Sequence, residues 1–269
     1  MMWVNGHVAE CLALTDRGLL YGDGVWETLL VKAGQAQFLD WHLERLHHGL
    51  QVLKIALPDW DTLQQEIQRA CQTRQQAVLK IIITRGAGQR GYSPRTDAPP
   101  TRIVQITPWA GYPPEYAQQG IRVTRCTTCL ARQPLLAGFK HLNRLEQVLA
   151  RAEVGDEYQE GLVSDTAGQV IEGTMSNLFL INAQGDVLTP DLSQCGIAGV
   201  MRRFVIQTLA EVGIQCHIQA VTDRDVEQAQ ALFMTNSLMG VLPVRECIGK
   251  NYKIPPLIRE LQAVTNVIS

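Results

Sequence analysis

Apolar and polar residues follow two periodic patterns along this chain of 269 residues, and together they predict a mixture of strands and helices. Residues 25–31 read as a strand, because their side chains alternate between two faces. Leucines recur every three or four residues from 43 to 53, which predicts a helix capped at its start by Asp40. The other predicted strands cover 37–39, 78–84, 102–107, 121–126, 160–165, 170–172, 177–182, 215–220 and 231–235. The other predicted helices cover 59–73, 201–212 and 223–230, and further helices begin at 143 and 256.

The order of these elements predicts the fold class and a division into two domains. Strands and helices do not alternate strictly, which favours a mixed α/β (α+β) fold over a doubly wound sheet. Asn5-Gly6 predicts a hairpin turn within 3–10. Proline and glycine cluster between 108 and 116, as is typical of a linker. We therefore expect an N-terminal α/β domain over 1–110, a linker over 111–117 and a C-terminal α/β domain over 118–269.

Composition and charge exclude several classes of function. The formal net charge of −2 gives no electrostatic reason to expect a nucleic-acid partner. No apolar run approaches the roughly 20 residues that span a bilayer, and the first residues lack the charged and apolar regions of a signal peptide. Seven cysteines at irregular spacings do not suggest a disulfide framework. We expect a cytoplasmic protein without a membrane segment.

Two short motifs match known site patterns only in part. Residues 86–91 match G-x-G-x-x-G after a predicted strand, but Pro99-Pro100 follows where a dinucleotide site requires a helix. We interpret this segment as a glycine loop that holds Arg90 and Tyr92 towards a cleft. The pair Cys126-x-x-Cys129 has no second ligand pair, and no histidine motif for zinc is present, so we expect no metal.

Two residues match the chemical needs of pyridoxal 5′-phosphate. Lys140 stands alone before a helical pattern, and a lysine near apolar surroundings can act as a nucleophilic amine. Glu172 offers a carboxylate that can pair with a pyridinium nitrogen and keep the ring an electron sink. Either residue alone is more often an ordinary surface group, and only the two together indicate this cofactor.

A third requirement, a site for the phosphate, is also present. Gly199 precedes a predicted helix, whose first backbone N–H groups, around Val200 and Met201, can bind a phosphate dianion. Arg45 and a hydroxyl within 235–237 could complete that anion site.

The spacing from Glu172 through Asn177, Thr189 and Gly199 to Arg202 resembles the signature of the class IV family of pyridoxal-phosphate-dependent aminotransferases. The resemblance covers essentially the whole chain. That family contains branched-chain aminotransferases, D-amino-acid aminotransferases and aminodeoxychorismate lyase. Three stretches resemble the lyase in particular, namely 21–24, 85–92 and 138–147.

The resemblance implies a fold and a set of cofactor ligands. The fold is the two-domain fold type IV, similar to D-amino-acid aminotransferase, with the cofactor in the interdomain cleft and usually assembled as a homodimer. The implied catalytic residues are Lys140, which forms the Schiff base, and Glu172, which pairs with the pyridinium nitrogen. The implied phosphate ligands are Arg45, the backbone around Val200 and Met201, and Ser237.

For the lyase, the resemblance implies conversion of 4-amino-4-deoxychorismate into 4-aminobenzoate and pyruvate in folate biosynthesis, by Schiff-base formation, proton abstraction and elimination. The substrate carries two carboxylates, for which Arg90 is the first candidate and Arg85 or Arg95 the next. Thr28 and Tyr92 are further candidate substrate contacts.

Two alternatives remain open from the sequence. A class IV aminotransferase acting on D- or branched-chain amino acids would use the same Lys140 and Glu172. The segment 141–143, His-Leu-Asn, departs from the glycine-rich segment that follows the lysine in branched-chain enzymes and disfavours that branch. A non-catalytic protein that kept the fold is the second alternative, and the intact lysine and glutamate argue against it.

Overall fold

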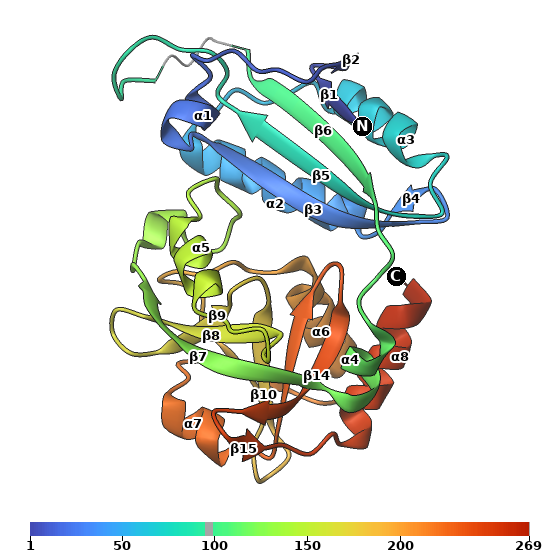
Figure 1. The fold of residues 1–269 in the computed structure, drawn as a ribbon, viewed down its shortest axis with the longest axis vertical. Coiled ribbons are helices and arrows are strands. Elements are labelled where there is room, and N and C mark those ends of the chain that lie inside the picture. The colour runs from blue at the N-terminus through green and yellow to red at the C-terminus, as the bar shows by residue number, and fades with distance from the viewer. Residues whose placement is uncertain (95–98, 269) are drawn as a thin grey trace. The chain divides into compact units, whose positions relative to one another are not determined.

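The computed structural model describes residues 1–94 and 99–268, and the chain folds into two compact units. The first unit comprises Met1–Ala110 together with Phe139–Asn143, and the second comprises Gly111–Gly138 together with Arg144–Ser269. Each unit is built on its own sheet with helices packed on it (Figure 1). The mixed α/β class predicted from the sequence is confirmed.

The first unit is a six-stranded antiparallel sheet with the strand order β2-β1-β6-β5-β3-β4. Its strands are β1 (Met2–Val4), β2 (His7–Val8), β3 (Gly24–Lys32), β4 (Gln35–Ala36), β5 (Gln76–Thr84) and β6 (Thr101–Pro108), and its helices are α1 (Arg17–Tyr21), α2 (Leu39–Leu53) and α3 (Trp60–Cys71). The predicted hairpin turn is present, because Asn5 and Gly6 both have positive φ, 49° and 82°. Helices α2 and α3 pack on the sheet.

The start of α2 differs from the sequence prediction. A strand was expected over 37–39 with Asp40 as the helix cap, whereas β4 ends at Ala36 and α2 already begins at Leu39. Ala33 and Gly34 form the turn after β3, and only two residues pair with β3 before the chain leaves the sheet. Phe38, in the left-handed region, then turns the chain directly into α2.

The second unit contains a nine-stranded sheet with the order β12-β11-β10-β13-β14-β7-β8-β9, and β15 pairs with β14. Its strands are β7 (Ile121–Leu130), β8 (Glu160–Asp165), β9 (Val170–Gly173), β10 (Asn177–Ile181), β11 (Val187–Pro190), β12 (Cys216–Gln219), β13 (Ala231–Asn236), β14 (Gly240–Cys247) and β15 (Lys250–Asn251). Its helices are α4 (Pro114–Gln119), the 3-10 turn η1 (Pro134–Leu136), α5 (Leu145–Ala152), α6 (Val200–Glu211), α7 (Asp223–Gln228) and α8 (Pro256–Ile268). Strand β9 contacts β10, so the sheet curls back on itself.

Both faces of this second sheet are covered by apolar side chains. On β10, Leu178 and Leu180 enter one core, while Phe179 and Ile181 enter another beneath α6 and α8. Phe179 stacks on Phe233 of β13 with 4.8 Å between ring centres. The nearly continuous apolar character of β10 therefore follows from burial on both sides.

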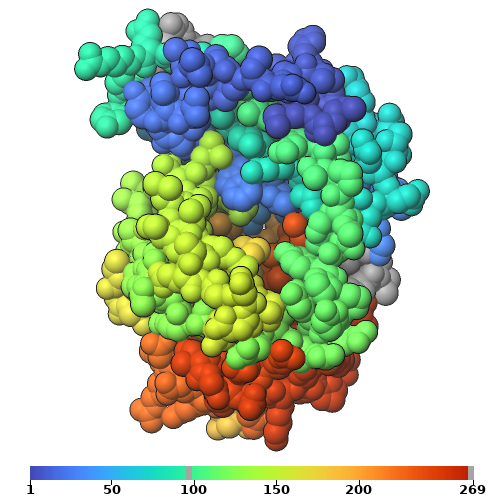
Figure 2. All heavy atoms as spheres, viewed as in Figure 1, coloured from blue at the N-terminus to red at the C-terminus, as the bar shows by residue number. Residues whose placement is uncertain are grey.

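Helix α5 does not bury the apolar side that the sequence pattern predicts. Leu145, Val148 and Leu149 are 78%, 61% and 60% exposed, and the helix packs instead through Ala150 against Cys126. Helix α5 and the loop after it contribute to the face shown in Figure 2, in yellow-green. The small side chain of Ala150 allows the helix to lie close to β7 and β8, which leaves the larger side chains outside.

Two further features concern the connection between the units. Part of the segment expected to be a linker, 111–117, is helical, because Pro114 provides a backbone preorganised for the first turn of α4. The short segment Phe139–Asn143 belongs to the first unit although its neighbours in sequence belong to the second. None of the helices in the part of the chain that the structure describes is long and apolar enough to cross a membrane.

Candidate functional site

Lys140 lies in the segment of the first unit that connects η1 to α5. The residue before it, Phe139, is 1% exposed and packs beside Gly49 of α2. A Cβ at Gly49 would lie 2.8 Å from the Phe139 ring, so only glycine permits this approach. Lys140 itself is half-buried, with its Nζ 3.8 Å from the centre of the Trp26 ring. Phe139 thus anchors the lysine segment in the core of the first unit.

Arg45, the predicted phosphate ligand from α2, is held by a buried carboxylate on β3. Its Nε donates to Oε1 of Glu27 at 2.8 Å and its Nη2 to Oε2 at 2.6 Å. Nδ1 of His42 lies 2.6 Å from the same Oε2, and both Glu27 and His42 are 0% exposed. Burial by itself raises the pKa of Glu27, but the charge and hydrogen bonds of Arg45 and the bond to His42 outweigh it and lower that pKa to about 2. The carboxylate is therefore ionised and fixes the direction of the guanidinium group.

Glu172, the predicted partner of the pyridinium nitrogen, is buried at the end of β9 in the second unit. Its Oε2 accepts a hydrogen bond from the backbone N–H of Ile197 at 2.9 Å. Gly196 permits this approach, because a Cβ there would lie 2.7 Å from Ile171 and 3.4 Å from Oε2. The carboxylate is thus attached to the segment that leads into α6.

Asn177 connects this carboxylate to the start of α6. Its Nδ2 donates to the carbonyl of Ile197 at 2.8 Å and lies 3.5 Å from Oε2 of Glu172, while its Oδ1 accepts from the N–H of Gly199 at 3.1 Å. A Cβ at Gly199 would lie 2.1 Å from that oxygen. The signature residues Glu172, Asn177 and Gly199 are therefore connected by hydrogen bonds.

The first turn of α6 has the properties of an anion site. Gly199 is the N-cap and has no side chain to accept from the first N–H groups, those of Val200 and Met201. The first turn contains no acidic residue, so the positive end of the helix dipole is not offset locally. Arg202 connects this turn to β11, because its Nε donates to Oγ1 of Thr189 and its Nη2 donates to the carbonyl of Pro190. Burial lowers the pKa of Arg202, and the nearby charge of Glu172 opposes that change.

Ser237, the third predicted phosphate ligand, lies in the turn between β13 and β14. Asn236 shapes this turn, because its Oδ1 accepts from the N–H groups of Leu238 and Met239, both at 2.9 Å. Within the described residues, the buried hydroxyl of Thr235 has no hydrogen-bond partner. Thr235 pairs with Asn177 across β13 and β10, so the two side chains share a face near the start of α6. An unsatisfied buried hydroxyl beside an uncapped helix start fits a bound phosphate.

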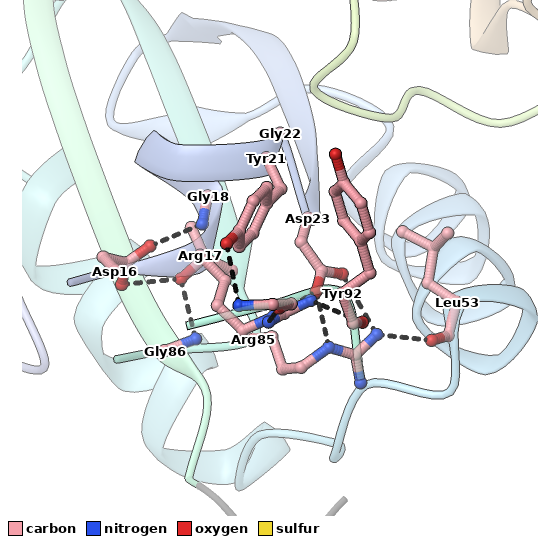
Figure 3. Close-up of polar contacts among 12 residues, drawn as sticks. Asp16, Arg17, Gly18, Tyr21, Gly22, Asp23, Leu53, Arg85, Gly86 and Tyr92 are labelled. Atoms are coloured by element: carbon pink, nitrogen blue, oxygen red, sulfur yellow. Dashed lines mark hydrogen bonds and ion pairs between the residues drawn. The ribbon is translucent and has the colours of Figure 1, made fainter. Parts of the chain in front are cut away.

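The glycine loop after β5 is fixed by a cluster of two arginines around Asp23 (Figure 3). Arg17 donates to Asp23 and to the carbonyls of Gly91 and Tyr92. Arg85 also donates to Asp23 and reaches the carbonyls of Leu53 and Lys54. Arg85 is 5% exposed, and it therefore serves the internal structure of the first unit rather than the substrate contact that its position in the sequence suggested.

The remaining predicted substrate contacts lie in the same unit. Arg90 is exposed on the glycine loop, and Tyr92 is 85% exposed with its ring 5.5 Å from that of Tyr21. Thr28 is half-buried on β3, on the same side of the strand as Trp26. Arg95 lies outside the described residues.

The structure thus groups the predicted residues within each unit. The first unit holds Lys140, Arg45, Thr28, Arg90 and Tyr92. The second unit holds Glu172, Val200, Met201 and Ser237, together with Asn177 and Thr235.

Three residues that support this arrangement were missed at the level of sequence. Glu27 and Trp26 lie on a strand whose alternation gave no sign of chemistry. Arg17 is the first residue of α1 and holds Gly91 and Tyr92, which are more than 70 positions away in the sequence. The available signal for Glu27 was its place in the alternation of 25–31, where it shares a face with the apolar Val25 and Leu29, because a charged residue on such a face normally requires a partner.

Comparison with known proteins gives a consistent result. Residues 24–247 match the family described as Amino-transferase class IV. The chain is 38% identical to aminodeoxychorismate lyase of Vibrio harveyi, over 99% of this chain and 100% of that protein. It also resembles the crystal structure of 4-amino-4-deoxychorismate lyase from Pseudomonas aeruginosa, with a TM-score of 0.94, 44% identity and coverage of 98% and 97%. The fold is shared with a hypothetical aminotransferase from Mycobacterium tuberculosis solved in a PLP-bound form, at a TM-score of 0.82 and 20% identity over 100% and 98% of the chains.

Proposed function

Because the chain belongs to the class IV aminotransferase family, we propose that it is a lyase that converts 4-amino-4-deoxychorismate into 4-aminobenzoate and pyruvate. Similarity along the full length to lyases of that specificity supports this choice within the family. The structural observation that carries the proposal is the link through Asn177 between the buried carboxylate of Glu172 and the uncapped start of α6. This link supports the proposal, because it connects a carboxylate to backbone N–H groups that can bind an anion.

The residues present fit pyridoxal 5′-phosphate, the cofactor of this family. The N–H groups of Val200 and Met201, the hydroxyl of Ser237 and the guanidinium of Arg45 would hold the phosphate. Glu172 would hold a proton at the pyridine nitrogen. When bound, the cofactor supplies an electron sink for the pair released at the substrate carbon.

Lys140 performs the proton transfers in this proposal. Its Nζ would hold the cofactor covalently before the substrate binds and would be free for proton transfer afterwards. The free Nζ then removes the proton from the carbon that bears the amine. The carbon–oxygen bond to the enolpyruvyl group breaks, and Nζ returns the proton to that leaving oxygen. Arg90 binds a substrate carboxylate, and Thr28 and Tyr92 contact the substrate beside it.

The function is tested by supplying 4-amino-4-deoxychorismate to the purified holoenzyme without any keto acid. Equimolar 4-aminobenzoate and pyruvate over many turnovers are expected, and Lys140→Ala should abolish both. Full activity in Lys140→Ala would refute the mechanism. Turnover of D-alanine or leucine only in the presence of 2-oxoglutarate would identify an aminotransferase instead.

We further propose that the enzyme is a cytoplasmic homodimer that serves folate biosynthesis. The exposed apolar stripe on α5, made of Leu145, Val148 and Leu149, supports a partner at this surface, because contiguous exposed apolar side chains commonly mark interfaces. Light scattering should give twice the chain mass for the wild type and a lower mass for Val148→Asp. Val212→Asp is the matched control, since Val212 is similarly exposed, at 64%, on another helix end. A wild-type monomer would contradict the proposal.

A further inference from the structure

The segment 140–142 continues the first sheet at the edge of β3. On one side, β3 pairs with β5 along its full length, but on the other side β4 reaches only Val31 and Lys32. The segment 140–142 lies on the same side of β3 as β4, but at the other end of the strand. There the N–H of Trp26 donates to the carbonyl of Lys140 at 2.9 Å, and the N–H of Leu142 donates to the carbonyl of Gly24 at 3.0 Å. The backbone of Lys140 is therefore held as part of a sheet, although it lies between two irregular segments.

The side chain of Trp26 adds two contacts to this backbone pairing. Its indole Nε1 donates to the carbonyl of His141 at 3.1 Å, so Trp26 binds the carbonyls of Lys140 and of the next residue. The face of its ring lies under Nζ of Lys140, 3.8 Å from the ring centre. A second ammonium group, that of Lys80 on β5, lies 4.7 Å from the same ring centre. All of these residues belong to the first unit.

These contacts restrict the Nζ end of the Lys140 side chain, which would otherwise be its least ordered part. A lysine side chain has four rotatable bonds, and a free amine at its end samples many positions unless neighbouring groups limit them. The ring blocks one side of that space and attracts the ammonium form towards its face. The two backbone hydrogen bonds fix the point from which the side chain starts.

We infer that Trp26 is a positioning residue for Lys140, which directs the lysine amine towards its covalent and proton-transfer partners. The inference rests on the proposed function of Lys140 and extends it to a residue on another strand. Trp26 acts through Lys140 and transfers no proton itself. A misplacement of about 1 Å in a reacting group can reduce a rate by about 100-fold, so loss of this support has a measurable effect.

The test compares Trp26→Leu, which removes the ring and the indole N–H, with Trp26→Phe, which keeps a ring. In holoenzyme saturated with cofactor, Trp26→Leu should lower kcat by about 30-fold while KM for 4-amino-4-deoxychorismate changes less than about threefold. Trp26→Phe should lower kcat by about three- to tenfold, because the ring contact survives and one hydrogen bond is lost. Trp60→Leu is the matched control, since Trp60 stacks on His47 of α2 instead of on Lys140.

A second readout is independent of turnover. Pyridoxal phosphate is added to cofactor-stripped protein, and attachment to Lys140 is trapped with borohydride at successive times and quantified by peptide mass spectrometry. Attachment should be about tenfold slower in Trp26→Leu than in wild type or Trp60→Leu. Rates within twofold of wild type in a folded Trp26→Leu would overturn the inference.

The remaining outcomes are also decisive. If Trp26→Leu fails to fold, Trp26→Phe decides, and wild-type kcat and attachment rates in that variant would overturn the inference. Absence of trapped cofactor on Lys140 in the wild-type protein would refute the proposed function itself. Equal trapping in wild type and all variants would refute only the role of Trp26.

Discussion

Replacing Glu27 by glutamine tests whether the buried ion pair with Arg45 stabilises the first unit. The substitution keeps the size of the side chain and one acceptor but removes the negative charge. Glu27 is 0% exposed and receives two hydrogen bonds from Arg45, at 2.8 and 2.6 Å. In Glu27→Gln the Arg45 guanidinium would lose the negative charge that now lies at these distances. Breaking one partner of a buried pair is costly because the remaining charge stays away from water.

The magnitude follows from the pKa of Glu27. A carboxyl group whose pKa is held at about 2 instead of its ordinary 4.5 has its ionised form stabilised by about 3 kcal/mol. We therefore expect Glu27→Gln to lower the free energy of unfolding at pH 7 by about 3 kcal/mol, an amount in the range measured for broken buried pairs. If Arg45 binds the phosphate as proposed, the affinity for pyridoxal phosphate should fall as well.

The assay is urea denaturation followed by circular dichroism, with Glu246→Gln as the matched control. Glu246 and Arg122 form the same two-point contact, at 2.8 and 2.9 Å, but their side chains are 23% and 29% exposed. Solvent screens that pair, so its loss should destabilise the protein much less. If Glu27→Gln is no more destabilised than Glu246→Gln, burial does not set the strength of the Glu27 pair and the reasoning is wrong.

Three further predictions concern pH and the second unit. Because the pKa of Glu27 is lower in the folded state, the stabilising contribution of Glu27 should be complete above about pH 4.5 and disappear as the pH falls towards 2. Measured against pH, the free energy of unfolding should show this loss in wild type and lack it in Glu27→Gln. Asn177→Ala should lower the melting temperature and weaken pyridoxal phosphate binding about tenfold or more, because the N–H of Gly199 and the carbonyl of Ile197 lose their partner. An unchanged dissociation constant from a spectroscopic titration would contradict the role of Asn177 in holding the start of α6. Gly199→Ala should have a similar effect on both measurements, since its Cβ would displace Oδ1 of Asn177, and a melting temperature equal to wild type would show that the close approach is not required.

Much of the local structure could be predicted from neighbouring residues. The turn at Asn5-Gly6 requires positive φ at both positions, which this dipeptide adopts easily. Asp59 accepts from the N–H of Thr62 at 2.7 Å, as expected for the start of the second predicted helix. The predictions failed where local signals were weak, as at Asp40, because the length of β4 and the turn after β3 determined where α2 began.

The candidate site could be predicted only as a list of residues. Lys140 and Glu172 were identified by their spacing to other residues of the family pattern, and their roles stay predictions. Their surroundings could not be found in this way, because Glu27 pairs with Arg45 across 18 positions and Trp26 contacts His141 across 115. Arg85 shows the limit most clearly, since nothing local distinguishes an arginine that binds substrate from one that binds Asp23 across 62 positions.

The sequence by itself determined most of the strands and helices, the mixed α/β class and the family, because these depend on short-range periodicity and on residues at fixed spacing. It did not predict α1, β11 or β14. Only the tertiary structure decided that Phe139–Asn143 joins the first unit, that α5 exposes its apolar side and that Glu27 and Trp26 support Arg45 and Lys140. The physical reason is that burial and charge pairing depend on which distant segments meet. Periodicity indicates which side chains share one face of a helix or strand, but not which distant segment packs on that face.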